Sequence, residues 1–229
     1  KTYQGPGEYS WAYAVAVSPD GSRIAVTGWS YRVGPNPDAS GVADAATVAY
    51  DTEGNQLWAM RYGGGADGTA AHGDAITFSP DGTRVYVAGE VPNLHADDAV
   101  YGILAYNAAS GSQVWATMYQ PAGYYSRGQA ITVSHDGATV YVTGDSGNAT
   151  VRDVATLAIT SSTGVIAWRS RYNTGPLVDF DSGISMALAP DGKRLYVGAI
   201  AQKPSNNTTV QPGNAVNAYD FLTVGYNVT

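Results

Sequence analysis

Short stretches of alternating apolar and polar residues recur along the chain, and each stretch is bounded by a turn signal. One stretch precedes a Pro-Asp-Gly motif or its close variant, and a second follows that motif and ends in glycine. Because side chains alternate between the two faces of a β-strand, this pattern predicts two strands joined by a hairpin turn. The paired stretches are residues 14–17 and 23–28, 75–78 and 84–89, and 130–133 and 139–144.

A third apolar stretch and a fourth aromatic stretch follow each pair, with a glycine turn between them. The third covers residues 47–50, 103–106 and 156–159, and the turns lie at Gly54, Gly111 and Gly164. The fourth carries a Trp and, four residues later, a Tyr, a spacing that places both rings on one face of a strand. These pairs are Trp58 and Tyr62, Trp115 and Tyr119, and Trp168 and Tyr172. Their recurrence at one repeat position indicates rings that fill the space between neighbouring repeats rather than a cofactor platform.

The turn motif occurs four times and divides the chain into four repeats. Its aspartates are Asp20, Asp81, Asp136 and Asp191, separated by 61, 55 and 55 residues. Each interval can hold four short strands with their turns, which is the content of one β-propeller blade. The sequence therefore predicts an all-β protein, a β-propeller of four-stranded antiparallel blades. We expect a single propeller domain or fragment over residues 1–229, with repeats at 8–62, 68–119, 124–172 and 178–229.

The two ends of the chain do not complete a fourth blade in the regular way. The last repeat ends at its third strand, residues 221–226, and lacks the Trp-bearing strand, whereas residues 1–4 resemble the end of such a strand. Residues 1–7 are thus a candidate closing strand. Three arrangements are open: a closed four-bladed ring, two chains paired into an eight-bladed ring, or part of a larger seven- to eight-bladed propeller. The last two arrangements are favoured for two reasons. The last repeat has no Trp-bearing strand, and few residues would join its third strand to the candidate closing strand in a four-bladed ring.

Composition narrows the functional classes. The 229 residues include 28 Gly and 17 Tyr, and 44% of them are hydrophobic, which suits strands and tight turns. The net charge of −7 would repel a phosphate backbone, so we expect no nucleic-acid partner. The absence of cysteine excludes disulfides, thiolate metal sites and cysteine nucleophiles. No apolar run of about 18 residues occurs, so we expect no membrane span.

Residues 44–51, followed by residues 54–58 and by Arg61 and Tyr62, resemble the bacterial SBBP-type β-propeller repeat. The run from residue 80 to residue 89 carries the same resemblance, and the Trp-bearing strand is also similar to the repeats of PQQ-type propellers. Such repeats occur mostly in exported or surface proteins of bacteria and share no single activity. The resemblance therefore implies a secreted bacterial protein, extracellular or at the cell surface. The chain has no vicinal cysteines of the kind found in PQQ dehydrogenases, and we expect no cofactor.

Long and diverse loops on one face of the propeller indicate where a ligand would bind, because variable loops on a rigid scaffold commonly carry function. The loops after the second strand of each repeat cover residues 29–43, 90–97, 145–152 and 202–219. The innermost strand of each blade lines the central channel, and its first residues should converge at the channel mouth on this face. The expected ligand-binding residues are Trp11, Tyr13, His72, Asp74, Arg127 and Gln129, with Ser182 and Ile184 at the same positions of the fourth repeat. The alternative is that these side chains plug the channel and cap strand ends with hydrogen bonds.

Repeated carboxylates raise the question of a metal site. Asp44, Asp98, Asp153 and Asp220 recur before the third strand of each repeat. Each lies on its own blade and none belongs to an Asp-x-Asp-x-Asp-Gly loop, so hydrogen bonding at the strand entry is favoured over calcium. The three histidines, His72, His95 and His135, lie far apart in the repeat pattern. We therefore predict no zinc site and no other bound metal.

Three functions are open at this point. The first is a non-catalytic scaffold propeller of an exported bacterial protein, which binds a protein, a glycan or a small ligand through the long-loop face. The second is a propeller enzyme, either a hydrolase or lyase or a quinone-dependent oxidoreductase, with its site at the channel mouth. The third is a lectin-like propeller, since aromatic rings stack on sugars and Tyr9, Trp11, Tyr124 and Tyr125 lie in or near the loops. We also expect self-association or a second chain that completes the propeller.

Overall fold

The computed structural model describes residues 1–7, 9–31, 42–63, 70–92, 99–120, 125–147, 151–173, 179–203 and 218–228. Every regular element in these ranges is a β-strand, and they contain no helix that is long and apolar enough to cross a membrane. The strands follow one another in the order that the alternating stretches predict. The all-β prediction is therefore confirmed.

Each of the first three repeats forms a four-stranded antiparallel blade. Blade 1 consists of β1 (Ser10–Val17), β2 (Arg23–Tyr31), β3 (Ala43–Asp51) and β4 (Gln56–Gly63). Blade 2 consists of β5 (His72–Phe78), β6 (Arg84–Pro92), β7 (Ala99–Asn107) and β8 (Gln113–Tyr119). Blade 3 consists of β9 (Tyr125–Val133), β10 (Thr139–Gly147), β11 (Val151–Thr160) and β12 (Ile166–Tyr172). Blade 4 has three strands, β14 (Ser182–Leu188), β15 (Arg194–Lys203) and β16 (Ala218–Asn227), and the short β13 (Asp179–Phe180) pairs with β11.

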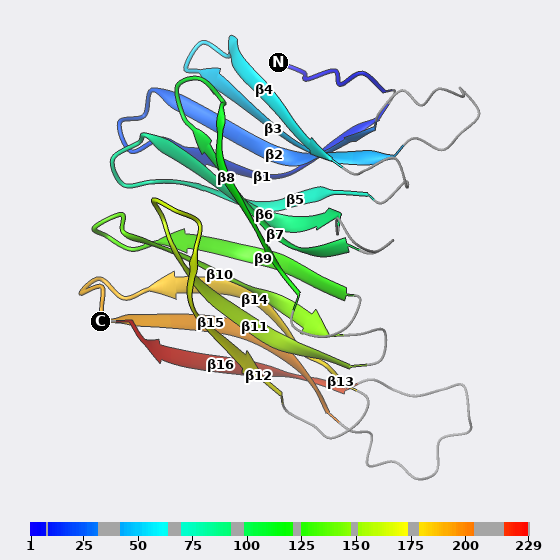
Figure 1. Cartoon of the computed structure of the whole chain (residues 1–229), viewed down its shortest axis with the longest axis vertical. Coiled ribbons are helices and arrows are strands. Elements are labelled where there is room, and N and C mark those ends of the chain that lie inside the picture. Colours follow the sequence, from blue (N-terminus) through cyan, green and yellow to red (C-terminus); the bar gives the residue numbers. More distant parts are fainter. Residues whose placement is uncertain are drawn as a thin grey trace.

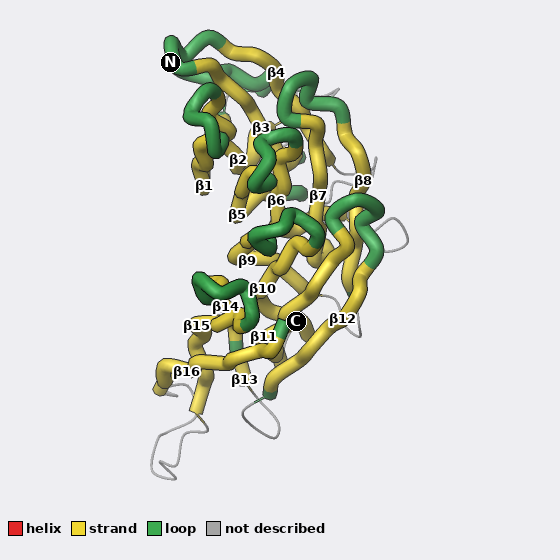
Figure 2. Tube along the Cα trace, turned by 90° about the vertical axis from the view of Figure 1, so that its left-hand side faces the viewer, coloured by secondary structure: helices red, strands yellow, loops and turns green. Residues whose placement is uncertain are grey.

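The four blades lie side by side in an open arc (Figure 1 and Figure 2). The inner strands β1, β5, β9 and β14 follow one edge of the arc, where each contacts the next, and the outer strands β4, β8 and β12 follow the other edge (Figure 2). Blades 1 and 4 lie at opposite ends of the molecule, and residues 1–7, which contain no strand, lie at the blade 1 end. The closed four-bladed ring is therefore not observed. The arc has the shape expected of part of a larger propeller.

The repeated Pro-Asp-Gly turns are held by their own side chains. In the first turn, Asp20 accepts hydrogen bonds from the Ser18 hydroxyl at 2.6 Å and from the Ser22 backbone N–H at 3.0 Å. These bonds stabilise the charged carboxylate and lower the pKa of Asp20 to about 2. Gly21 has a φ of 72°, which only glycine adopts without strain. The motif is thus architectural, as the sequence predicts.

The recurring tryptophans fill the space between blades. Trp58 of blade 1 lies on the turn at Gly111 of blade 2, and its indole N–H donates to the carbonyl oxygen of Ala108 at 2.9 Å. Trp115 of blade 2 lies in the same way on Gly164 of blade 3 and donates to Ser161 at 2.8 Å. Both rings are buried, and the interpretation of these tryptophans as inter-blade packing is confirmed.

The aspartates expected before the third strand lie within its first three residues, Asp44 on β3 and Asp153 on β11, and are paired with arginines from the outer strand. Arg61 of β4 lies 3.0 Å from Asp44, and Arg171 of β12 lies 2.6 Å from Asp153. These pairs fit the predicted hydrogen bonding at the strand entry. Asp98 lies outside the described residues, and Asp220 lies on β16.

Candidate ligand-binding site

Three positions of each repeat build the rim of the arc on the long-loop side. We number them by their place in the repeat. The first position holds Trp11, His72, Arg127 and Ser182. The second position lies two residues later and holds Tyr13, Asp74, Gln129 and Ile184. The third position lies on the second strand of each blade, opposite the first, and holds Trp29, Glu90, Asp145 and Ile200. We call these twelve residues the inner row.

A β-bulge in each inner strand sets the direction of these side chains. In blade 2 the register shifts between Gly73 and Ala75, directly after the pair formed by Gly73 and Gly89. The bulge brings the His72 carbonyl oxygen so close to Gly89 that a Cβ there would lie 1.9 Å from it. Glycine is therefore needed at this strand position, and the same contact recurs at Gly28 and Gly144.

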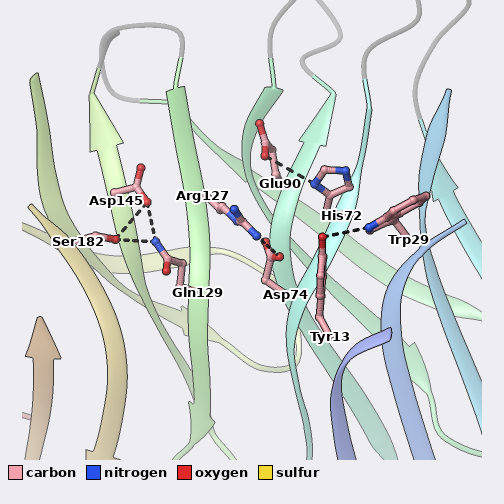
Figure 3. Close-up of polar contacts among 9 residues, drawn as sticks. All are labelled: Tyr13, Trp29, His72, Asp74, Glu90, Arg127, Gln129, Asp145 and Ser182. Carbon is pink, nitrogen blue, oxygen red and sulfur yellow. Dashed lines mark hydrogen bonds and ion pairs between the residues drawn. The ribbon is translucent and has the colours of Figure 1, made fainter. Parts of the chain in front are cut away.

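The second position of one blade contacts the first position of the next (Figure 3). Tyr13 lies against His72, with ring centroids 6.4 Å apart and the rings nearly perpendicular. Asp74 pairs with Arg127, and Gln129 donates a hydrogen bond to the Ser182 hydroxyl at 2.5 Å. The structure thus brings the predicted residues together as a row of neighbouring pairs along the inner edge.

The pair of Asp74 and Arg127 is joined by two hydrogen bonds. The guanidinium donates through Nε at 2.7 Å and through Nη2 at 2.5 Å to the two oxygens of one carboxylate. The hydrogen bond to Asp74 raises the pKa of Arg127, so the guanidinium stays charged. The Asp74 side chain is only 7% exposed, whereas that of Arg127 is 41% exposed. Arg127 therefore presents a fixed positive charge to the rim.

His72 and Glu90 form a second group beside this pair. The His72 Nδ1 atom lies 4.0 Å from a Glu90 carboxylate oxygen. Burial lowers the pKa of His72, an effect that the charge of Asp74 opposes and that of Arg127 reinforces. Burial also raises the pKa of Glu90. At neutral pH the imidazole is uncharged and has one donor and one acceptor nitrogen.

The pKa of His72 gives a test of this arrangement. Following the imidazole Cε1–H signal by NMR during a pH titration should give a pKa below 6.5. Because the folded protein then holds this proton less tightly than the unfolded chain, the contribution of His72 to stability is present above pH 6.5 and declines as the pH falls toward the folded pKa.

An Asp74→Asn variant provides the internal comparison for this titration. It removes the charge that favours the imidazolium and should lower the pKa of His72 further. A pKa above 6.5 in the wild-type chain, or one that rises in the variant, would contradict the described geometry.

The third position is the part of the row that the sequence prediction missed. Asp145 accepts a hydrogen bond from Gln129 at 2.8 Å and lies 3.4 Å from Arg152. The Arg152 guanidinium also lies over the rings of Tyr125 and Phe180, 4.8 Å and 5.3 Å from their centroids. A signal for this position exists, because Trp29, Glu90 and Asp145 each stand eight residues after the turn glycine of their repeat.

Aromatic rings dominate the blade 1 end of the row. Trp11 stacks on Trp29 with ring centroids 5.9 Å apart, and the Trp29 indole N–H donates to the Tyr13 hydroxyl at 3.0 Å. Tyr9 packs edge-on against Tyr31 next to them. Of the other rings expected near the loops, Tyr125 is exposed and Tyr124 lies outside the described residues. Within the described ranges, no three His, Asp or Glu side chains come together as metal ligands.

The fold and the inner row define a β-propeller fold with a mixed polar and aromatic rim along the inner edge of the arc. Residues 43–206 match the family model described as outer membrane protein assembly factor BamB. The match covers more than half of the chain, and the chain belongs to this family of PQQ-like β-propeller repeats. A search of curated proteins finds no match.

Solved structures match this chain at low sequence identity. Hydrazine synthase from Kuenenia stuttgartiensis is 16% identical, with a TM-score of 0.58 over 95% of this chain and 51% of the other. Acylaminoacyl peptidase from Pyrococcus horikoshii is 10% identical, with a TM-score of 0.50 over 97% of this chain and 32% of the other. BamB from Moraxella catarrhalis is 14% identical, with a TM-score of 0.47 over 82% and 48%. The chain thus spans about half the length, or less, of these three structures.

Proposed function

We propose that this chain is a non-catalytic binding propeller of an exported bacterial protein and that it engages a protein partner through the inner row. The observation that carries the proposal is the chemistry of the row. A guanidinium, an imidazole, carboxylates and aromatic rings reach one rim from neighbouring blades (Figure 3), and the guanidinium of Arg152 lies beside the row against Asp145. Protein–protein interfaces commonly combine aromatic and arginine side chains at their centre with hydrogen-bond donors and acceptors at their rim.

Contacts within the row support this proposal because they order the side chains before a partner binds. Asp74 pairs with Arg127, and Asp145 accepts a hydrogen bond from Gln129 and also pairs with Arg152, which lies beside the row on β11. Side chains that are already ordered lose less conformational entropy on binding. The two guanidinium groups keep exposed edges, and such groups pair well with carboxylates and backbone carbonyls of a protein.

Family membership supports a protein partner and an exported location. The family is described by its member BamB, an outer membrane protein assembly factor. That role is stated for BamB. Propellers of one family carry different activities, so the choice of partner rests on the row and not on the fold. For this chain, protein binding and a location at the cell surface are both parts of the proposal.

An array of immobilised peptides and oligosaccharides tests the proposed class of ligand. The labelled wild-type chain should bind peptides, and an Arg127→Gln variant should bind the selected peptide about 10-fold or more weakly, because a hydrogen bond from a charged donor contributes about 1.5–3 kcal/mol. Arg171→Gln is the matched control, since Arg171 also pairs with a carboxylate but lies on the outer strand β12. Its affinity should stay within about twofold of the wild type.

Two results of this experiment would contradict the proposal. Binding to oligosaccharides alone would indicate the lectin-like function instead. Equal losses of peptide binding in Arg127→Gln and Arg171→Gln would show that the inner row is not the binding surface, provided that both variants remain folded at the assay temperature.

A further inference from the structure

Glu90 is the carboxylate of the inner row that has no hydrogen-bond donor in the described part of the chain. It lies on β6 between its register partners, His72 of β5 and Tyr101 of β7. Its one ion-pair contact there is with the His72 Nδ1 atom at 4.0 Å, which is beyond hydrogen-bonding distance (Figure 3). The Glu90 side chain is 23% exposed. It is therefore largely enclosed but can still be reached from the rim.

The other two carboxylates of the row are matched by cations. Asp74 accepts two hydrogen bonds from Arg127. Asp145 lies 3.4 Å from Arg152. The three carboxylates thus have two guanidinium groups between them, and the imidazole next to Glu90 is uncharged at neutral pH. The unmatched negative charge falls on Glu90.

The surroundings of Glu90 make its charge costly to keep. Burial is the main cause that raises its pKa, and the carboxylates of Asp74 and Asp145 raise it further. The guanidinium groups of Arg127 and Arg152 oppose this rise without cancelling it. A cation placed directly beside the carboxylate would recover the free energy that burial costs.

The segments outside the described ranges that adjoin blades 2 and 3 contain no lysine or arginine. These segments are residues 64–69, 93–98, 121–124, 148–150 and 174–178. Across the whole chain, Arg32 is the one lysine or arginine that lies outside the described ranges. A cation for Glu90 is therefore expected from another molecule, and the net charge of −7 favours the approach of a basic one.

We propose that Glu90 and His72 bind a basic side chain of the protein partner, a lysine or an arginine. The inference rests on the proposed function and adds the chemistry of the ligand at one place in the inner row. A lysine ammonium between the two side chains donates to the Glu90 carboxylate and to the His72 Nδ1 atom. The 4.0 Å between these acceptors allows both bonds at the usual length of about 2.8 Å.

A substitution array of the selected peptide tests this preference. Replacing one lysine or arginine of the peptide with norleucine should weaken binding to the wild-type chain about 10-fold or more, because a hydrogen bond to a charged group is lost. An ionic strength of about 0.15 M screens attraction between distant charges. In Glu90→Gln, the lysine and norleucine peptides should bind within about twofold of one another.

Glu53→Gln is the matched control for the loss of one negative charge. Glu53 is exposed in the turn between β3 and β4, at the end of these strands away from the rim. This variant has the same net charge as Glu90→Gln. It should keep the preference for the lysine peptide.

The carboxyl carbon signal of Glu90 gives a second readout by NMR. Its titration in the free chain should give a pKa above 4.5. A saturating amount of the lysine peptide should lower this pKa, because a bound cation favours the charged carboxylate, whereas the norleucine peptide should not. In Arg32→Gln the pKa of Glu90 in the free chain should equal that of the wild type.

The outcomes separate this inference from the proposed function. A wild-type chain that binds no peptide would overturn both. Peptide binding without a preference for a basic residue, or with a preference that Glu90→Gln retains, would overturn the inference and leave the proposed function in place. A pKa of Glu90 that rises in Arg32→Gln would show that an arginine of the chain itself already pairs with Glu90, and would also overturn the inference.

Discussion

Replacing Trp115 with alanine should lower the free energy of unfolding by about 3–5 kcal/mol, the range measured for large aromatic side chains removed from protein cores. The ring is buried between blades 2 and 3, lies tilted against Tyr86 and rests on Gly164, and its indole N–H donates to the carbonyl oxygen of Ser161. The variant loses these contacts and leaves a cavity and an unpaired carbonyl oxygen. Urea unfolding followed by circular dichroism measures the change.

Two further variants test whether the loss comes from the packing between blades. Val165→Ala removes an exposed apolar side chain beside Gly164 and should change stability by less than about 0.5 kcal/mol. Gly164→Ala keeps Trp115 but places a methyl group 2.8 Å from the indole, at a φ of 76°. It should cost more than Gly21→Ala, where φ is 72° and no atom lies within 4 Å of the new Cβ. Equal costs for the two glycine variants would contradict the docking of Trp115 on this turn.

Removing the charged partner of Asp74 should have the next largest effect. We expect Arg127→Met to lower the free energy of unfolding by about 2–3 kcal/mol, because a nearly buried carboxylate loses both of its donors. Asp74→Asn should cost only about 1 kcal/mol, since Arg127 is partly exposed and can turn toward water. Chemical unfolding of the two variants and of the double variant gives the coupling energy between the side chains.

Arg169→Met is the control for the loss of an exposed arginine. Arg169 lies on the outer strand β12 and is exposed, so its removal should change stability by less than about 0.5 kcal/mol. If Arg127→Met were no more destabilising than Arg169→Met, or if the effects of Arg127→Met and Asp74→Asn were additive, the pair would not be formed in solution.

The strands and the packing of the tryptophans could be predicted from sequence because they depend on local and repeated signals. Alternation located strands such as β5 and β10, and the turn motif between the first and second strands of each repeat set their order. Counting back from each turn also identified the first and second positions of the inner row, including Asp74 and Arg127. Each repeat carries the same turn, so a residue count from it locates the same place in every blade.

The pairing of Asp74 with Arg127, and the part of the row that includes Glu90 and Asp145, could not be predicted. Contacts between blades depend on strand twist and on the packing of neighbouring sheets, which the residue count does not contain. The third position was overlooked because Trp29, Glu90 and Asp145 share no chemistry, although they share a place in the repeat. The sequence does not predict whether the four blades close into a ring, because closure also depends on strand twist and sheet packing. The described chain forms an open arc (Figure 2).

Titration of the isotopically labelled chain with an array-selected peptide, followed by amide NMR spectra, tests most directly whether the inner row binds a partner. The largest shift changes should fall on residues 72–74, 88–90, 127–129 and 143–147, where the inner strands begin and the second strands end. The turns around Asp81 and Asp136, at the other end of the same strands, should not shift. Shift changes concentrated on those turns, with none at His72 or Arg127, would contradict the proposed site.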